Sequence, residues 1–186
     1  DDLWQRCLCV DVNQYFDDAS KRLAGAAESV IVLANPVQPH SEGEIVLTSA
    51  DPADHPDIRM NYYGDPYDME VMVAVLRRAL DVVVHWPGER TLGPLLVPPA
   101  LAAKHGYAPG DTPSDDLLVD LARHYSFTVY HLTSTCRMGS VVDSRLRVRG
   151  VEGLRVADAS VMPNVVSGNT NAAAIMIGEK AAEMLA

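Results

Sequence analysis

His131 is the residue of this sequence best suited to acid-base chemistry. It lies in the segment "VYHLTSTCRMG", among apolar and small polar residues. Its imidazole can accept a proton near neutral pH better than any other side chain. A lone histidine is more often structural than catalytic, so a catalytic role needs a partner. Cys136 lies in the same segment, but the spacing does not establish that the two side chains face each other as a nucleophile pair.

The tripeptide Asn169-Thr170-Asn171 lies between a predicted strand and a predicted terminal helix. The Asn169 amide could hydrogen-bond a substrate hydroxyl without competing for its proton. Asparagine is also a good helix N-cap, and the sequence leaves these two roles open. The helix start itself presents unpaired N–H groups and a partial positive charge, which suit an anionic or electron-accepting ligand.

Asp158 is a further polar candidate, at the end of the predicted strand "LRVAD". An aspartate at this position can form a turn, yet a strand end is also where a ribose or ribityl hydroxyl is often held. We expect no metal site, because the remaining histidines lack the HxxxH or HExxH spacing of metal ligands. They are His40, His55, His85, His105 and His124.

Three helices are predicted to position these residues. The longest periodic stretch, "DMEVMVAVLRRALDVVV" (residues 68–84), has apolar residues at helical spacing, with Asp68 as its predicted N-cap. We interpret its Met and Val stripe as core packing. Ser114 is predicted to cap a second helix, "DDLLVDLARHY", and an Ala-rich terminal helix is predicted to start near Asn169.

The predicted strands are short. The β-branched run "VIVL" (residues 30–33) and the alternating run "EIVLTS" predict two strands of one sheet. In "LRVRGVEGLRVADASV", two alternating runs flank residues 150–153, which predicts a hairpin. The apolar, Pro- and Gly-rich residues 86–112 fit either a packed loop or a lid over an apolar pocket.

Composition excludes some classes of function. The chain has 186 residues, 48% of them hydrophobic, and 15 basic against 25 acidic residues give a net charge of −10. This charge disfavours binding to nucleic acid or anionic lipid, and no apolar run approaches the roughly 18 residues of a membrane span. Cys7, Cys9 and Cys136 form neither a disulfide framework nor a zinc-type set, so we expect a cytoplasmic protein. Because the sequence begins with Asp-Asp, we interpret it as a fragment or a processed subunit.

Residues 130–186 closely resemble the C-terminal signature of the glucose-methanol-choline (GMC) oxidoreductases, flavoenzymes that oxidise alcohols with FAD. The resemblance rests on "YHLTSTCRMG", "VVDSRLRVRGVEGLRVADASVMP" and "SGNTNAAAIMIGEKAAEML". Residues 34–83 resemble the substrate-binding domain of the family, although "HSEGE" departs from its usual Ser-Arg-Gly turn.

The resemblance implies a fold of the α+β or α/β class in two parts. Residues 29–130 would form a substrate-binding domain with an antiparallel sheet and helices, joined by a connecting segment, residues 1–28. Residues 131–186 would add C-terminal strands and a helix that complete a Rossmann-like FAD-binding domain and carry the catalytic residues.

The resemblance also assigns roles to individual residues. His131 matches the catalytic base, and Asn169 matches the second active-site position, which implies a His-Asn pair. Asp158 and Ala159 match the strand end along the FAD pyrophosphate and ribityl chain. The helix that Asn169, Thr170 and Asn171 open would point at the pyrimidine end of the isoalloxazine ring. The implied reaction moves hydride from a primary or secondary alcohol to flavin N5, while His131 takes the hydroxyl proton.

The GxGxxG loop of such flavoenzymes does not occur in this sequence. The resemblance therefore implies that an N-terminal FAD-binding portion, on a separate chain or on a segment outside this sequence, acts as the partner of this chain. Two alternatives stay open: a lyase of the hydroxynitrile lyase type, and a non-catalytic subunit with the same fold. The sequence identifies neither the alcohol nor the electron acceptor.

Overall fold

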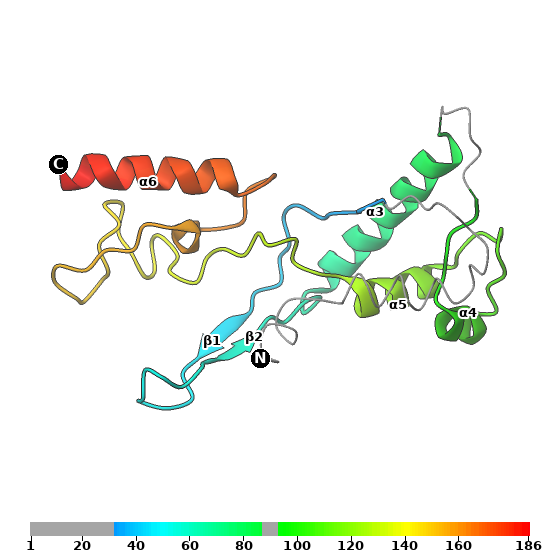
Figure 1. Ribbon diagram of the computed structural model, residues 1–186, viewed down its shortest axis with the longest axis horizontal. Coiled ribbons are helices and arrows are strands. Elements are labelled where there is room, and N and C mark those ends of the chain that lie inside the picture. Colours follow the sequence, from blue (N-terminus) through cyan, green and yellow to red (C-terminus); the bar gives the residue numbers. More distant parts are fainter. Residues whose placement is uncertain (1–31, 87–92) are drawn as a thin grey trace. The chain divides into compact units, whose positions relative to one another are not determined.

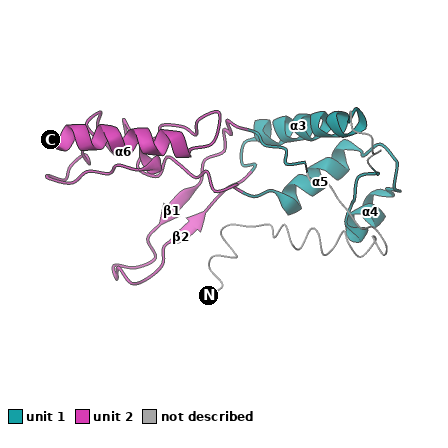
Figure 2. Cartoon of the chain, turned by 45° about the horizontal axis from the view of Figure 1, so that its top comes forward, with its two compact units in different colours: residues 1–36, 63–127 teal, residues 37–62, 128–186 magenta. Residues whose placement is uncertain are grey.

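The computed structural model describes residues 32–86 and 93–186 (Figure 1). The chain divides into two compact units, which are described separately (Figure 2). Unit 1 contains residues 63–127 and the chain up to residue 36, and unit 2 contains residues 37–62 and 128–186. In the described part, no helix is long and apolar enough to cross a membrane.

Unit 1 is built from α3 (Pro66–Val84), α4 (Pro99–His105) and α5 (Asp115–Tyr125). As predicted, Ser114 caps α5, because its Oγ atom accepts a hydrogen bond from the Leu117 N–H at 3.2 Å. Apolar residues of α4 and α5 form the core, against which residues of α3 pack. The buried members are Val97, Leu101, Ala102, Tyr107, Leu117, Leu118 and Leu121.

The helix α3 begins earlier than predicted. Its N-cap is Asp65, whose Oδ1 accepts a hydrogen bond from the Tyr67 N–H at 2.9 Å, whereas Asp68 lies buried in the first turn. The prediction was wrong because Pro66 follows the cap, and proline suits the first helical position, where no N–H partner is needed.

The described part of residues 86–112 packs into unit 1. Val97 and Ala102 are almost completely buried, and α4, which was not predicted, lies within this segment. Gly106 ends α4 in the left-handed region, with φ of 62°. These contacts favour the packed alternative over a lid for the described residues.

Unit 2 begins with a hairpin. β1 (Glu44–Val46) pairs antiparallel with β2 (Asp57–Arg59), so that Glu44 faces Arg59. The strand β1 was predicted from the sequence, but β2 was not. The predicted partner of β1 in the sheet was the run of residues 30–33. Residues 30–31 lie outside the described residues, and Val32 and Leu33 are not in a strand.

The C-terminal part of unit 2 is built on turns, the 3-10 helix η1 (Ala159–Val161) and α6 (Asn171–Leu185). The turn predicted at residues 150–153 is present, but the strands beside it are reduced to bridges between Val142 and Val148 and between Arg147 and Arg155. The core of this part joins the turns to η1 and α6. Its buried members are Val142, Leu146, Val161, Met162, Ile177 and Ala181.

The described helices and small antiparallel sheet agree with the predicted α+β class. The Rossmann-like completion stays a prediction, as do the substrate-binding role of residues 29–130 and the FAD-binding role of residues 131–186. The predicted connecting segment, residues 1–28, lies outside the described residues. The unit boundary near residue 128 groups the β1–β2 hairpin with the C-terminal part.

Candidate active site

The centre of the candidate site is a hydrogen bond between two residues that lie 39 positions apart. Nδ1 of His131 is 2.9 Å from Oγ1 of Thr170. The imidazole is half-buried, and Thr170 is buried with 8% of its surface exposed. The structure thus joins the predicted base to the start of α6 through Thr170, and leaves the other ring nitrogen, Nε2, out of this bond.

A tight turn of the backbone presents His131. The hydroxyl of Thr128 accepts a hydrogen bond from the Tyr130 N–H at 2.8 Å. Val129 and Tyr130 both adopt left-handed backbone conformations, with φ of 45° and 64°. Such conformations cost roughly 1 kcal/mol or more for residues other than glycine, so the surrounding contacts of this unit must hold them.

Thr170 is the N-cap of α6 by position, but its side chain makes no capping hydrogen bond. Its hydroxyl is used for His131 instead. The first-turn N–H groups of α6 are therefore not satisfied by the cap residue, which is the arrangement that favours a negatively charged or electron-accepting group at a helix start. Because the cap is Thr170, the N-cap alternative for Asn169 is wrong.

Asn169 and Asn171 are exposed on either side of Thr170. Within residues 32–86 and 93–186, neither amide group has a hydrogen-bond partner. An amide without a protein partner is available to a substrate hydroxyl, which can both donate to it and accept from it. Asn169 precedes Thr170, the hydrogen-bond partner of His131, in the chain.

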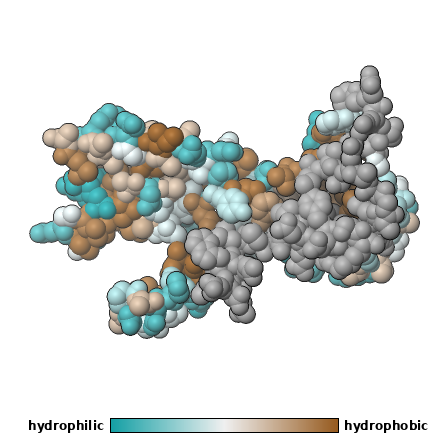
Figure 3. Space-filling model, in the orientation of Figure 1, coloured by the Kyte–Doolittle hydropathy of each residue, from teal (hydrophilic) through white to brown (hydrophobic). Residues whose placement is uncertain are grey.

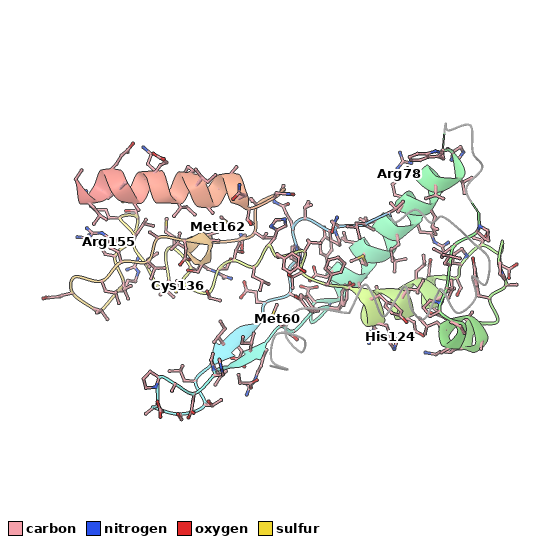
Figure 4. The ribbon with its side chains drawn as sticks, in the orientation of Figure 1. Met60, Arg78, His124, Cys136, Arg155 and Met162 are labelled. Atoms are coloured by element: carbon pink, nitrogen blue, oxygen red, sulfur yellow. The ribbon has the colours of Figure 1, made fainter. Side chains whose placement is uncertain are left out.

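Asp158 forms a turn. Its Oδ1 accepts a hydrogen bond from the Ser160 N–H at 2.8 Å and caps η1, whose first residue is the half-buried Ala159. A neighbouring segment holds η1 in place, because the Cys136 N–H donates to the Ser160 carbonyl at 3.0 Å (Figure 4). The Ser160 hydroxyl is buried and has no hydrogen-bond partner among the described residues.

The Cys-His alternative gains no support. The Cys136 thiol is free and half-buried, and the hydrogen-bond partner of the His131 ring is Thr170. Among the described residues, no group of three or more His, Cys, Asp or Glu side chains could hold a metal ion.

A hollow of about 360 Å³ lies elsewhere in unit 2. It is lined by residues of the segment 143–155. Its walls include Arg147, Arg149 and Arg155, but none of the predicted site residues. Arg147 is paired with Asp143 at 2.7 Å, and this pair shapes the turn. The hollow is therefore not part of the candidate site.

Comparison with known protein families identifies the family of this chain. The model of the C-terminal GMC oxidoreductase domain matches residues 39–178, which include His131, Asp158 and Thr170. The chain belongs to the GMC oxidoreductase family. The resemblance inferred from the sequence is thereby confirmed.

Among its relatives, an alcohol dehydrogenase (acceptor) of Pseudomonas putida is 42% identical over 157 residues, covering 79% of this chain and 26% of that protein. An oxygen-dependent choline dehydrogenase of Escherichia coli is 37% identical over 152 residues, covering 78% of this chain and 25% of that protein. The chain thus spans about a quarter of the length of these GMC relatives.

Solved structures show a similar fold. An FAD-dependent oxidoreductase from Chaetomium thermophilum superposes with a TM-score of 0.68 at 29% identity, over 80% of this chain and 25% of that one. A pyridoxine 4-oxidase superposes with a TM-score of 0.64 at 28% identity, over 79% of this chain and 28% of that one.

Thr170 has a role that was not predicted from the sequence. Thr170 and Asn171 were predicted as cap and flavin-edge residues, and Thr170 does occupy the N-cap position, but it was not predicted as the partner of His131. The sequence offered only a weak signal, a hydroxyl at a predicted helix start, because a contact across 39 residues has no signature in local spacing.

Proposed function

We propose that this chain is the C-terminal part of an FAD-dependent oxidoreductase that acts on primary or secondary alcohols. The observation that carries the proposal is the His131–Thr170 hydrogen bond at the start of α6, where the exposed Asn169 immediately precedes Thr170. It is supported by membership of the GMC oxidoreductase family and by relatives named for alcohol and choline oxidation.

His131 is the proton acceptor in this proposal. With Nδ1 on Thr170, Nε2 is the nitrogen left for a substrate hydroxyl. Asn169 orients the substrate oxygen, so that its O–H faces Nε2. Loss of the hydroxyl proton to His131 makes the carbinol carbon a better hydride donor, and the carbon–oxygen bond becomes a carbonyl as the hydride leaves.

The residues present fit an FAD cofactor on two observations. The N–H groups at the start of α6 receive no bond from the side chain of the cap residue, and the buried Ser160 hydroxyl lacks a partner among the described residues. Asp158 and Ala159 would lie along the pyrophosphate and ribityl chain, and Thr170 and Asn171 along the pyrimidine end of the ring. Bound FAD supplies the hydride acceptor, and the helix start favours the negative charge that results.

We further propose that a second portion of protein completes the FAD site. This portion corresponds to the part of the GMC relatives that the present chain does not match. The match covers only about a quarter of those relatives, and no GxGxxG loop occurs in this sequence. Large apolar side chains also lie exposed on unit 2, among them Leu47 at 80% and Ile175 at 59%. Figure 3 shows hydrophobic residues on the visible surface of the C-terminal part. Flavin absorbance of the 186-residue chain purified alone tests this point, and tight stoichiometric FAD on that chain would refute it.

The test of the function uses the full-length protein that carries this chain, loaded with FAD. Anaerobic stopped-flow mixing with primary and secondary alcohols measures loss of the oxidised flavin band. We expect His131→Ala to lower the reduction rate by roughly 10²–10⁴-fold, the usual contribution of a general base. His124→Ala is the matched control, because this exposed histidine lies on α5 and bonds a backbone carbonyl.

Two outcomes would contradict the proposal. A reduction rate unchanged in His131→Ala would indicate a subunit whose flavin chemistry does not use this histidine. An unreduced flavin with every alcohol, together with cleavage of hydroxynitriles, would indicate the lyase reaction.

A further inference from the structure

We propose that Thr170 is a positioning residue for His131, which orients the imidazole and accepts a hydrogen bond from its Nδ1–H group when the ring carries the substrate proton. This inference rests on the proposed function for its catalytic meaning. The contact between the two side chains is a property of the structure itself, with Nδ1 and Oγ1 2.9 Å apart.

The first argument is that the Thr170 hydroxyl is not needed by its own helix. Thr170 occupies the N-cap position of α6, where a threonine side chain normally accepts a hydrogen bond from an N–H of the first turn. Here the side chain makes no such bond. The helix forgoes a contact worth about 1 kcal/mol, and the hydroxyl serves the imidazole instead.

The second argument is the burial of Thr170, which is 8% exposed. A buried hydroxyl has given up its hydrogen bonds to water, and this costs free energy unless a protein group replaces them. The hydrogen bond between Thr170 and His131 is therefore favoured over a conformation in which the hydroxyl has no partner. A buried partner also has few rotamers to explore. The buried Thr170 side chain is itself restrained, and it therefore holds the imidazole of His131 in one orientation.

The third argument concerns charge. Both nitrogens of an imidazolium ring are donors, so the protonated ring needs an acceptor at Nδ1 as well as at Nε2. Within the described residues, Oγ1 of Thr170 is the group beside Nδ1, and its lone pairs can accept from an Nδ1–H. The contact therefore holds the ring with Nδ1 protonated, and Nε2 is left to accept the substrate proton.

The test replaces the hydroxyl at nearly constant shape. Thr170→Val removes the acceptor, and Thr170→Ser keeps it. In the full-length protein with FAD, we expect Thr170→Val to lower the flavin reduction rate roughly tenfold, as for the loss of one hydrogen bond in the transition state. Thr170→Ser should stay within about twofold of the wild type.

A second readout does not depend on activity. Imidazole ¹⁵N chemical shifts, measured by NMR on the protein labelled at histidine, report which ring nitrogen of His131 carries the proton in the neutral ring. We expect the Nδ1–H form to predominate in the wild type and in Thr170→Ser and to lose population in Thr170→Val, because only the first two keep an acceptor beside Nδ1. His124 in the same spectra is the internal control.

The outcomes separate the two proposals. A His131 tautomer population that is the same in Thr170→Val and in the wild type overturns the positioning role, whatever the activity shows. Equal losses in Thr170→Ser and Thr170→Val also overturn it, because they would indicate a packing effect. A changed tautomer population in Thr170→Val, combined with an unchanged reduction rate in His131→Ala, supports the contact and contradicts only the proposed function.

Discussion

Asp120 on α5 accepts hydrogen bonds from two side chains of α4. Its Oδ2 atom lies 2.5 Å from Nζ of Lys104 and 2.7 Å from Nε2 of His105. The bond from Lys104, followed by that from His105, lowers the pKa of Asp120 to about 2. The contact between α4 and α5 therefore includes a negative charge that acid removes.

Acid should weaken unit 1 through Asp120. The folded pKa lies below the ordinary value of 3.8, so the ionised carboxylate stabilises the fold above about pH 4, and this contribution is lost as the pH falls toward 2. We expect Asp120→Asn to lower the protection of the α4 amides against deuterium exchange at pH 7, after correction for the intrinsic exchange rate, and to flatten the fall of this protection between pH 4 and 2. Asp115→Asn is the control, because the carboxylate of Asp115 is exposed where it meets Arg77. An acid response equal in Asp120→Asn and the wild type would contradict this account.

Gly43 should be essential for the β1–β2 hairpin. A Cβ atom at this position would overlap the carbonyl oxygen of Arg59 and lie 2.8 Å from that of Met60, and both are backbone atoms that cannot rotate away. We expect Gly43→Ala to destabilise the protein by roughly 1–3 kcal/mol in urea unfolding, as for other overpacked sites. Gly168→Ala is the matched control, since a Cβ there meets nothing within 4 Å. Equal midpoints for the two variants would show that the hairpin tolerates the added methyl group.

Leu117 should anchor the core of unit 1. It lies on α5, is 1% exposed and belongs to the cluster that joins α5 to α4. Truncation removes buried surface and leaves a cavity, so we expect Leu117→Ala to lower the free energy of unfolding by about 2–5 kcal/mol. Val84→Ala, at a position on α3 that is 78% exposed, should change it by less than about 0.5 kcal/mol. A loss below 1 kcal/mol for Leu117→Ala would mean that the site collapses around the smaller side chain.

Asp158 offers a test that separates its turn from its proposed place beside FAD. Asp158→Ala removes the acceptor of the Ser160 N–H bond, and we expect a loss of about 1 kcal/mol in stability, as for other helix caps. Asp158→Asn keeps an acceptor oxygen at that position and should restore most of the stability. If the carboxylate also contacts FAD, both variants should release the cofactor faster than the wild type in a fluorescence assay of free flavin. Normal retention by Asp158→Asn would restrict the residue to the turn.

Helices that are marked by a cap residue or by apolar periodicity in their own sequence could be predicted from the sequence. Ser114 caps α5 as predicted, because a serine before an apolar-periodic run satisfies the first N–H groups of the helix. The body of α3 was predicted from its periodicity, and only its start was wrong, at Asp65 and Pro66. The family, too, was evident from the sequence, in the run of matching residues from 130 to 186.

Elements that depend on distant contacts were not evident. The seven residues of α4 begin at the second of two consecutive prolines, and the helix is held by burial of Leu101 and Ala102 against α5. The strand β2 has only three residues, and its pairing with β1 is set across the intervening turn. Neither has enough periodicity of its own to be predicted, since short helices and strands owe their stability to tertiary packing.

The sequence by itself determined the family and nominated His131 and Asn169 as the polar residues of the site. Only the tertiary structure decided which group meets the imidazole. That contact joins residues 39 apart, and it depends on a left-handed backbone at Val129 and Tyr130 and on a threonine that does not cap its own helix. Local preferences oppose both features, so they exist only because the packed fold stabilises them.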